Sequence, residues 1–239
     1  MDKVIAQVSV VPVRAEPSDK AEIVTQMLYG ESAEIIEMHG NWRKIKMHID
    51  GYEGWVDVKQ LRPLSEEAFL QRKTQPLQQP FKVCALENGQ QMLLSMGSEL
   101  QVDDAISVES NNLRSQIATV AEQFLNVPYL WGGRSFFGID CSGFIQVVYK
   151  VHGINLPRDA YQQAEEGRVL DFIEESQAGD LAFFENEEGK ITHVGLMLDQ
   201  QKIIHAHGKV RIDALDSIGI FNQEQNKHTH KLRFIKSIL

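Results

Sequence analysis

Cysteine is scarce in this sequence, which has only Cys84 and Cys141 among its 239 residues. Two thiols cannot form the set of disulfides that holds a small secreted domain together. The first residues also lack a secretory signal, and no apolar run approaches the roughly 18 residues of a membrane-spanning helix. These absences predict a cytoplasmic chain that is neither exported nor anchored, with both cysteines as free thiols.

Basic charge is in deficit as well. The chain has 24 Lys and Arg residues against 33 Asp and Glu residues, a formal net charge of −9. Such a charge repels nucleic acid and anionic membranes unless a basic patch offsets it, and the sequence has none. We therefore expect no nucleic acid and no membrane as partner. The hydrophobic content of 43% is that of a globular protein, and the length suits one large domain or two small ones.

Short β-prone runs separated by turns fill the first 64 residues. The run from Trp42 to Met47 alternates apolar and polar residues, as a half-buried strand does. The order of these pieces resembles a bacterial SH3-like barrel, which we place at residues 1–72. Residues 73–110 begin with the most linker-like stretch of the chain and continue with short strands. They are interpreted as a linker and a short β segment, either a reduced second SH3-like module or an extension of the first.

The hydrophobic period changes after residue 111. Apolar residues now recur at a spacing of three and four, which predicts helices. The three expected helices run from Leu113 to about Asn126, with an Asn as N-cap, from Cys141 to just before Gly153, and, as a short one, between Pro157 and Gly167. Strands return from Leu181 onward. Helices followed by an antiparallel sheet predict an α+β domain over residues 111–239.

Cys141 stands at the expected start of a helix. Backbone N–H groups and the positive end of the helix dipole favour a thiolate there, and a thiolate is a nucleophile. The same N–H groups point to where an oxyanion forms when a carbonyl is attacked. A lone cysteine is more often a small buried hydrophobe, and we interpret Cys84 in that way.

Histidines further along the chain favour the interpretation of Cys141 as a nucleophile. His193 lies in a strongly apolar strand, and His205 and His207 lie in the next one, so that a Cys and His nucleophile arrangement with a third polar group is available. A three-residue loop that pairs Leu198 with Lys202 places all three histidines on one face, whereas a two-residue loop moves His205 to the other face. Spacing does not choose between His205 and His207 as the third member.

A metal site is the alternative use of the same three histidines. Three imidazoles on one face can bind zinc and leave a position open for water. The sequence shows no acidic partner and no familiar zinc spacing beside them. We therefore expect no metal and no other cofactor.

Six motifs follow one another over residues 112–239. They are Pro128-Tyr129-Leu130-Trp131-Gly132-Gly133, Asp140-Cys141-Ser142-Gly143, Leu156-Pro157-Arg158-Asp159, Gly179-Asp180-Leu181-Ala182-Phe183-Phe184, Thr192-His193-Val194-Gly195 and Ile204-His205. In this order they resemble the NlpC-type cell-wall peptidases, which are papain-like cysteine peptidases. With the SH3-like region added, the whole chain is similar to the γ-D-glutamyl-L-diamino acid peptidases.

The resemblance implies a role for each matching residue. Cys141 is the implied nucleophile, His193 the general base and then acid, and His205 the residue that orients His193. Tyr129 matches a tyrosine near the oxyanion. The residues implied to contact the substrate are Asp140, Ser142, Arg158, Asp159 and Trp131 near the nucleophile, and Tyr52 and Glu22 from the SH3-like region.

Several of these residues also have a simpler interpretation. Asp140 can cap the helix of Cys141, Arg158 and Asp159 can be a surface pair, and Tyr52 can belong to the barrel core. The chain also departs from some relatives, which have Ser where Ala160 follows the Arg-Asp pair. A hydroxyl contact available to them is absent here.

The implied substrate is a murein peptide with a free N-terminal L-Ala, cut between γ-D-Glu and L-Lys or diaminopimelate during cell-wall recycling. A buried carboxylate and hydroxyl groups would recognise the free ammonium group. Three alternatives stay open: a secreted hydrolase of intact peptidoglycan, a muropeptide-binding protein without activity, and an acyltransferase. The sequence leaves the oligomeric state, the preferred diamino acid and the role of residues 76–110 open.

Overall fold

The computed structural model describes residues 2–86, 89–103 and 112–239. The chain forms two compact units, Met1–Val108 with Leu130–Gly138 and Glu109–Tyr129 with Ile139–Leu239. The segment Leu130–Gly138, which the sequence places in the catalytic domain, thus packs with the first unit. No helix in the described ranges is long and apolar enough to cross a membrane.

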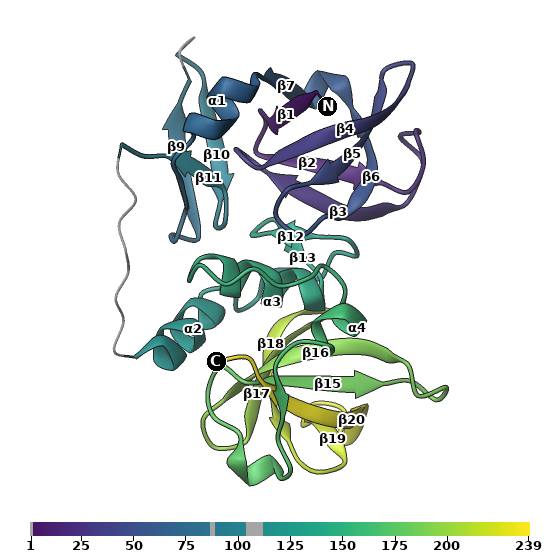
Figure 1. The fold of residues 1–239 in the computed structure, drawn as a ribbon. Coiled ribbons are helices and arrows are strands. Elements are labelled where there is room, and N and C mark those ends of the chain that lie inside the picture. The colour runs from purple at the N-terminus through teal and green to yellow at the C-terminus, as the bar shows by residue number, and fades with distance from the viewer. Residues whose placement is uncertain (1, 87–88, 104–111) are drawn as a thin grey trace. The chain divides into compact units, whose positions relative to one another are not determined.

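A seven-stranded antiparallel sheet forms the barrel of the first unit (Figure 1). Its strands are β1 (Lys3–Ala6), β2 (Val10–Arg14), β3 (Ile23–Leu28), β4 (Ser32–His39), β5 (Trp42–Met47), β6 (Glu53–Asp57) and β7 (Leu61–Leu64), in the order β3-β2-β6-β5-β4-β1-β7. A short 3-10 helix, η1 (Val58–Gln60), connects β6 to β7. The inward-facing apolar residues of these strands form one core, and Tyr52 packs against it half-buried.

The middle segment belongs to the first unit, and its described residues form one short helix and short strands. After α1 (Glu66–Gln71) its strands pair as two separate ribbons, β8 (Thr74–Pro76) with β11 (Glu99–Gln101) and β9 (Phe81–Ala85) with β10 (Gln91–Ser95). Glu87 and Asn88, between β9 and β10, and the end of the segment lie outside the described residues. Cys84 is half-buried in β9.

Arg134 attaches the segment Leu130–Gly138 to the barrel. This segment contains β12 (Arg134–Ser135), which pairs with β13 (Gly138–Ile139). The Arg134 side chain is fully buried and makes a two-pronged ion pair with Glu31, with Nη1 2.9 Å from Oε2 and Nη2 3.0 Å from Oε1. Arg134 Nη1 also donates to the carbonyl oxygen of Gln26 over 2.6 Å. A buried charge pair of this geometry fixes the segment that leads to Asp140 and Cys141.

The second unit combines helices with a closed sheet. Its helices are α2 (Leu113–Glu122), α3 (Cys141–Lys150), α4 (Ala160–Gln163) and the 3-10 helix η2 (Ile173–Glu175). Its strands are β14 (Arg168–Val169), β15 (Leu181–Glu185), β16 (Ile191–Leu198), β17 (Lys202–His207), β18 (Lys209–Leu215), β19 (Gly219–Asn222) and β20 (Lys227–Ser237). They pair antiparallel in the order β14-β20-β15-β16-β17-β18-β19, and the additional pairing of β20 with β19 closes the sheet.

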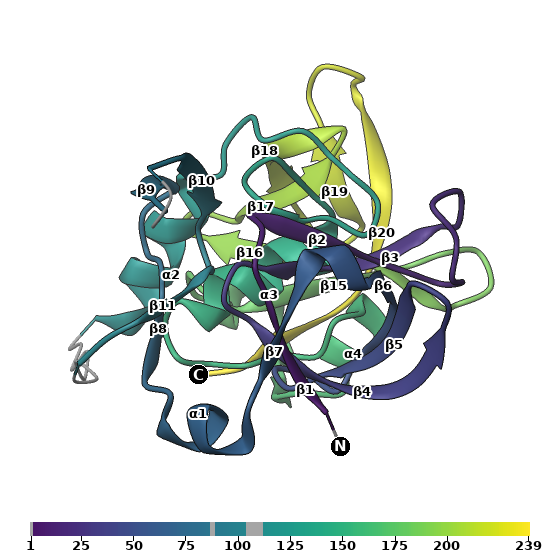
Figure 2. The same cartoon turned by 90° about the horizontal axis from the view of Figure 1, so that it is seen from above.

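Helix α3 is the central element of this unit. Every one of its residues is buried, and it packs against α2, β16 and β17, as Figures 1 and 2 show. A helix that is apolar all round belongs in the interior, so the expected single apolar stripe understates its burial. The predicted α+β unit, preceded by an all-β unit, is confirmed.

The helix boundaries needed corrections. Helix α2 ends at Glu122 rather than near Asn126, because single turns follow and Asn126 has a φ of 69°. Asn112 stands at its N-cap position without a side-chain cap bond. The third helix is only the four residues Ala160–Gln163, shorter than the span up to Gly167 that was expected.

Candidate active site

Cys141 is the first residue of α3 and is buried, with 7% of its surface exposed. The carboxylate of Asp140 caps the helix by accepting the Gly143 N–H over 2.7 Å. The backbone N–H groups of Ser142 and Val194 both hydrogen-bond to the Cys141 sulfur. Val194 follows His193 in β16, so the fold brings the nucleophile candidate to the strand of the base candidate.

The protonation state of Cys141 differs from the expectation for a helix N-terminus. Burial raises the pKa of the thiol to about 12, and the Asp140 carboxylate raises it further, while the two N–H groups and the Arg158 charge act in the opposite direction. Desolvation therefore outweighs the helix terminus. Cys141 rests as a thiol, and a base must take its proton when it attacks.

Arg158 is buried beside Asp140 and is not exposed as a surface residue. Its Nη2 donates to Asp140 Oδ2 over 2.5 Å and its Nη1 to Oδ1 over 3.1 Å, and Nη1 also donates to Ser142 Oγ over 2.9 Å. Ser142 Oγ lies 3.5 Å from Asp140 Oδ1. With the Gly143 N–H added, Asp140 Oδ1 accepts from three donors and Oδ2 from Arg158. Capping of the helix is therefore observed, and a contact of Asp140 with substrate stays a prediction.

The turn after Arg158 supports the nucleophile helix. Asp159 caps α4 in a capping box with Gln162. The buried Gln163 of α4 donates from Nε2 to the carbonyl oxygens of Ser142 and Pro157, over 3.0 and 2.9 Å. These bonds tie α4 to the first turn of α3. The sequence analysis did not identify Gln163.

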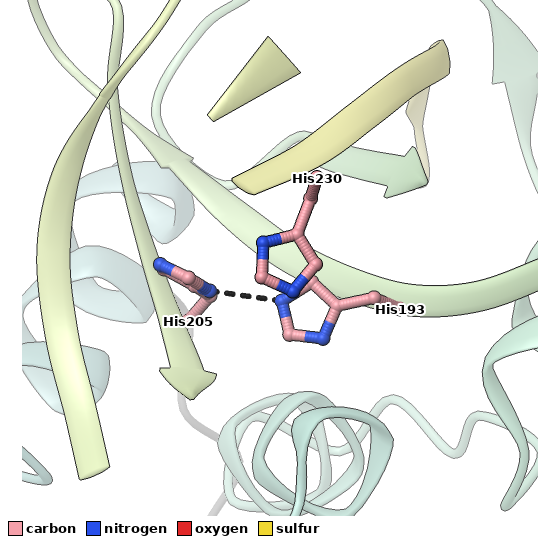
Figure 3. Close-up of side chains that lie close together, drawn as sticks. All are labelled: His193, His205 and His230. Atoms are coloured by element: carbon pink, nitrogen blue, oxygen red, sulfur yellow. Dashed lines mark hydrogen bonds between the residues drawn. The ribbon is translucent and has the colours of Figure 1, made fainter. Parts of the chain in front are cut away.

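His193 and His205 form a hydrogen-bonded pair. Leu198 pairs with Lys202, which is the register of the three-residue loop, and His193 Nε2 lies 2.8 Å from His205 Nδ1 (Figure 3). Gly195 makes room for this contact, because a Cβ there would lie 2.9 Å from His205 Cβ. The structure therefore brings His205 to His193, while His207 is exposed with its ring centre 6.2 Å from that of His205.

Asp213 continues the chain beyond His205. Its Oδ2 lies 3.0 Å from His205 Nε2, and Arg211 holds both of its oxygens over 2.7 and 3.0 Å. Burial raises the pKa of Asp213, but the bonds from His205 and Arg211 outweigh burial, so the pKa is lowered and the carboxylate is ionised. The sequence analysis missed Asp213. The alternation of β18 provides the signal, because Leu215 faces the core and Asp213 and Arg211 share its face.

The proton positions in this chain follow from Asp213. An ionised carboxylate only accepts, so His205 Nε2 carries the proton and His205 Nδ1 accepts. His193 Nε2 must then donate, which leaves the lone pair of His193 on Nδ1. Burial lowers the pKa of both imidazoles, that of His193 well below 6.5, so both rings are neutral near pH 7. A neutral ring with a free lone pair at Nδ1 is a general base.

Two other candidates lie close to these groups. The hydroxyl of Tyr129 has a pKa raised to about 12, first by burial and then by the charges of Cys141 and Asp140, so it is a neutral donor beside them. His230 of β20 stacks on His193 with ring centres 4.2 Å apart. The sequence analysis did not identify His230, because it lies 37 positions from His193 along the printed sequence and reaches it only through the closed sheet.

The remaining candidates belong to the first unit. Trp131 Nε1 donates to Glu22 Oε1 over 2.6 Å, and Trp131 is 63% exposed. Both residues were predicted to contact substrate, and the structure brings them together from segments far apart in the sequence. Tyr52 packs against the barrel core, which is its simpler interpretation. Contact of these three residues with substrate stays a prediction.

Comparisons with known proteins agree with both units. The model of the NlpC/P60 family matches residues 126–229, and that of the bacterial dipeptidyl-peptidase Sh3 domain matches residues 13–61. A γ-D-glutamyl-L-lysine dipeptidyl-peptidase of Bacillus subtilis is 33% identical over 214 residues, which cover 77% of this chain and 72% of the relative. A protein of the same name from Bacillus cereus is 29% identical over 247 residues and covers 84% and 73%.

A solved structure has the same fold. The crystal structure of an NlpC/P60 family protein from Bacillus cereus aligns over 99% of both chains with a TM-score of 0.82 and 21% identity. Three observations point to the same family. They are the match to the family model, the identity to the Bacillus subtilis relative, and the buried cysteine beside two hydrogen-bonded histidines. The chain belongs to the NlpC/P60 family of cysteine peptidases, with a bacterial SH3-like domain at its N-terminal side.

Proposed function

We propose that this peptidase hydrolyses the bond between γ-D-Glu and the L-diamino acid of murein peptides that begin with a free L-Ala. The observation that carries the reaction is the bonded chain from Asp213 through His205 to His193, beside the buried thiol of Cys141. The names of the Bacillus relatives support the bond that is cut.

The chemistry follows from the proton positions. His193 Nδ1 takes the thiol proton as the Cys141 sulfur attacks the γ-carbonyl carbon of D-Glu. The N–H of Cys141 and the Tyr129 hydroxyl are the proposed donors to the oxyanion. The protonated His193 then gives its proton to the amine of the diamino acid, which leaves, and a thioester remains. Water attacks the thioester with His193 again as base, which releases L-Ala-γ-D-Glu and restores the thiol.

The free amine is the less supported part of the substrate. Because Arg158 already compensates the charge of Asp140, an ammonium group at Asp140 has to share that carboxylate with Arg158. We propose that the amine binds at Asp140. The exposed carboxylate of Glu22 and the Tyr52 hydroxyl stay predicted substrate contacts of the first unit.

One assay tests both parts. L-Ala-γ-D-Glu-L-Lys, its diaminopimelate form and their N-acetylated forms are incubated with the chain and with Cys141→Ala, and the products are separated by mass spectrometry. We expect cleavage of the free peptides only, and none by Cys141→Ala. Equal cleavage of the acetylated peptides would remove the free-amine proposal, and activity of Cys141→Ala would remove the thiol mechanism.

A recycling role in the cytoplasm is part of the proposal. Release of soluble peptides from whole sacculi would instead favour a hydrolase of intact peptidoglycan. Binding of the free peptide without cleavage would favour a binding protein, and transfer of the acyl group to an added amine would favour an acyltransferase. Fractionation of the producing cells with an antibody against the chain tests the location.

A further inference from the structure

Three histidines gather on the face of the closed sheet where the catalytic residues are proposed. His193 of β16, His205 of β17 and His230 of β20 each offer one ring nitrogen, and these three nitrogens lie within 4.8 Å of one another. Figure 3 shows the His230 ring stacked beside that of His193, next to the hydrogen bond between His193 and His205. From this geometry we propose that His193, His205 and His230 bind one Zn²⁺ ion, which inhibits the peptidase.

The ligand type and the spacing suit zinc. Zinc takes imidazole nitrogens at about 2.0 to 2.1 Å in tetrahedral geometry, which places two ligand nitrogens ~3.3 Å apart. His193 Nε2 and His205 Nδ1 are 2.8 Å apart and need to separate only slightly. The ring nitrogen of His230, which lies within 4.8 Å of the other two nitrogens, has to move closer to them. The His230 side chain is half-buried, and its Nδ1 lies 2.9 Å from the hydroxyl of its neighbour Thr229, so we assign Nε2 to the metal.

Asp213 provides the outer partner that a zinc-binding histidine requires. A metal-binding His almost always donates its other ring N–H to a carboxylate or carbonyl, which orients the ring and makes it more basic. His205 Nε2 already donates to Asp213 Oδ2 over 3.0 Å, with Nδ1 turned toward His193. The sequence analysis considered His207 as a ligand and found no acidic partner. The structure supplies the partner and replaces His207 by His230.

The exposed side of the cluster gives the ion a route. His193 and His205 are buried, with 6% and 0% of their surfaces exposed. His230 is only half-buried, and the exposed His207 lies edge-on against it with ring centres 4.8 Å apart. An ion entering past these two rings meets His230 first and then the pair of nitrogens behind it.

Inhibition follows from the proton positions in the catalytic chain and rests on the proposed function. Zinc at His193 Nε2 displaces the proton from that atom, and the neutral ring then carries its proton on Nδ1. A ring with N–H at Nδ1 cannot take the proton of the Cys141 thiol. The ion therefore blocks the base without binding the sulfur, which separates this site from the usual reaction of metals with thiols.

The binding test uses the Cys141→Ala chain, so that the thiol cannot be a ligand. Zinc chloride is titrated into this chain by calorimetry, and the same titration is repeated after adding His230→Gln, Asp213→Asn or His228→Gln. His228 lies two positions from His230 in β20 and contacts Asp216, so His228→Gln is the matched control. We expect one ion per chain, a loss of about 10- to 100-fold in affinity for Asp213→Asn, at least as large a loss for His230→Gln, and no change for His228→Gln.

The inhibition test uses the chain with its thiol. Hydrolysis of the free tripeptide is measured with and without zinc, and then with excess EDTA. We expect reversible inhibition. The zinc concentration that gives half inhibition should be at least about 10-fold higher for His230→Gln than for His228→Gln. Circular dichroism of both variants verifies their folding.

The outcomes separate the two proposals. Equal zinc affinity of His230→Gln and its parent, or binding that disappears in Cys141→Ala, overturns the histidine site. If the chain cuts no peptide, calorimetry still measures the zinc site on its own. If the chain cuts the peptide and zinc does not bind Cys141→Ala, the peptidase proposal stands and the zinc proposal fails.

Discussion

His205 Nε2 lies 3.0 Å from Asp213 Oδ2, so a buried carboxylate fixes the orientation of the imidazole that touches His193. Three groups in a row therefore determine which nitrogen of His193 has a lone pair. Asp213 does not contact the reacting atoms and acts only through His205, so it is a positioning residue. Its removal tests whether the chain of hydrogen bonds matters for the rate.

Asp213→Asn is expected to lower kcat/KM while leaving KM nearly unchanged. An amide at this position can turn its NH₂ group toward His205 Nε2, which then accepts and reverses the proton positions of both rings. General base catalysis increases the rate by roughly 10²- to 10⁴-fold. Because Asp213 acts on His193 only through the His205 ring, we expect its replacement to lower kcat/KM by about 10- to 100-fold. Steady-state kinetics on the free tripeptide measure both constants.

Asp216→Asn is the matched control for this variant. Asp216 also contacts a histidine, His228, over 2.9 Å, but that pair is exposed. We expect an unchanged rate. An equal loss of kcat/KM in the two variants, or a rise in KM without a fall in kcat, would contradict a positioning role of Asp213.

Alkylation of Cys141 is expected to be slow at neutral pH and to increase steadily with pH. The pKa of the thiol is raised to about 12 by burial, so the thiolate fraction increases about tenfold per pH unit across the range from about pH 7 to 10. Iodoacetamide labelling followed by peptide mass spectrometry gives the rate for each cysteine. Cys84 in the same sample provides the reference for a half-buried thiol.

A labelling rate that is already constant near neutral pH would contradict the neutral thiol. It would show instead a thiolate stabilised at the start of α3, which is what the sequence alone predicts. His193→Ala distinguishes the sources of such a thiolate, because a thiolate paired with an imidazolium is lost in this variant, whereas one held by backbone N–H groups remains.

The stability of the second unit is expected to fall in mild acid. Burial lowers the pKa of His193, His205 and His230 in the folded chain, that of His230 from 6.5 to about 4. Below pH 6.5 the unfolded chain therefore binds more protons than the folded chain, and protonation favours unfolding. The contribution of these histidines to the free energy of unfolding is full above about pH 7 and decreases as the pH falls through 6.5, for His230 until its folded pKa of about 4.

Urea unfolding at a series of pH values measures this dependence. His230→Gln removes one of the three groups, so its free energy of unfolding should vary less between pH 7 and 4 than that of the parent. His228→Gln again serves as control, because His228 is an exposed histidine of the same strand. Identical pH dependence in all three chains would show that His230 does not titrate with folding.

The sequence predicted the catalytic unit well where local signals and register agree. A helix beginning at Cys141 and the strand of His193 are present as predicted, because the hydrophobic period is a local property. Of the two loop lengths that the sequence left open, the structure has the three-residue loop that pairs Leu198 with Lys202. The choice of His205 over His207 required the side-chain directions, which spacing does not contain.

Contacts that depend on long-range pairing were not predictable. His230 reaches His193 because β20 joins the sheet beside β15 and β19, far along the chain from β16. Asp213 lies nearer, on β18, the hairpin partner of β17, and only its side-chain direction was missed. The burial of Arg158 was missed because an Arg-Asp dipeptide is usually exposed, and here Asp140 compensates its charge. The raised pKa of Cys141 was not predicted, because the helix terminus is visible in the sequence, whereas the desolvation of the thiol is not.

Arg134 is expected to contribute strongly to the stability of the first unit. It is 0% exposed and pairs with Glu31, which is 1% exposed, and Glu31 Oε2 also accepts the N–H of Leu28 over 2.9 Å. Removing one partner leaves the other charge buried without compensation, which costs about 3 to 5 kcal/mol. Arg134→Met should lower the free energy of unfolding by that amount, measured by urea denaturation followed by the barrel tryptophans.

The double variant Glu31→Leu with Arg134→Met decides whether the charge itself is the cause. Replacing both partners by apolar residues removes the uncompensated charge, so the double variant should be more stable than Arg134→Met alone. Lys44→Met breaks the exposed pair of Lys44 with Glu53 and should cost no more than about 1 kcal/mol.

If the double variant loses as much stability as the sum of its single changes, the ion pair does not couple Leu130–Gly138 to the barrel. If coupling is found, a barrel fragment that ends at residue 103 should be less stable than the barrel within the whole chain, because it keeps Glu31 and lacks Arg134.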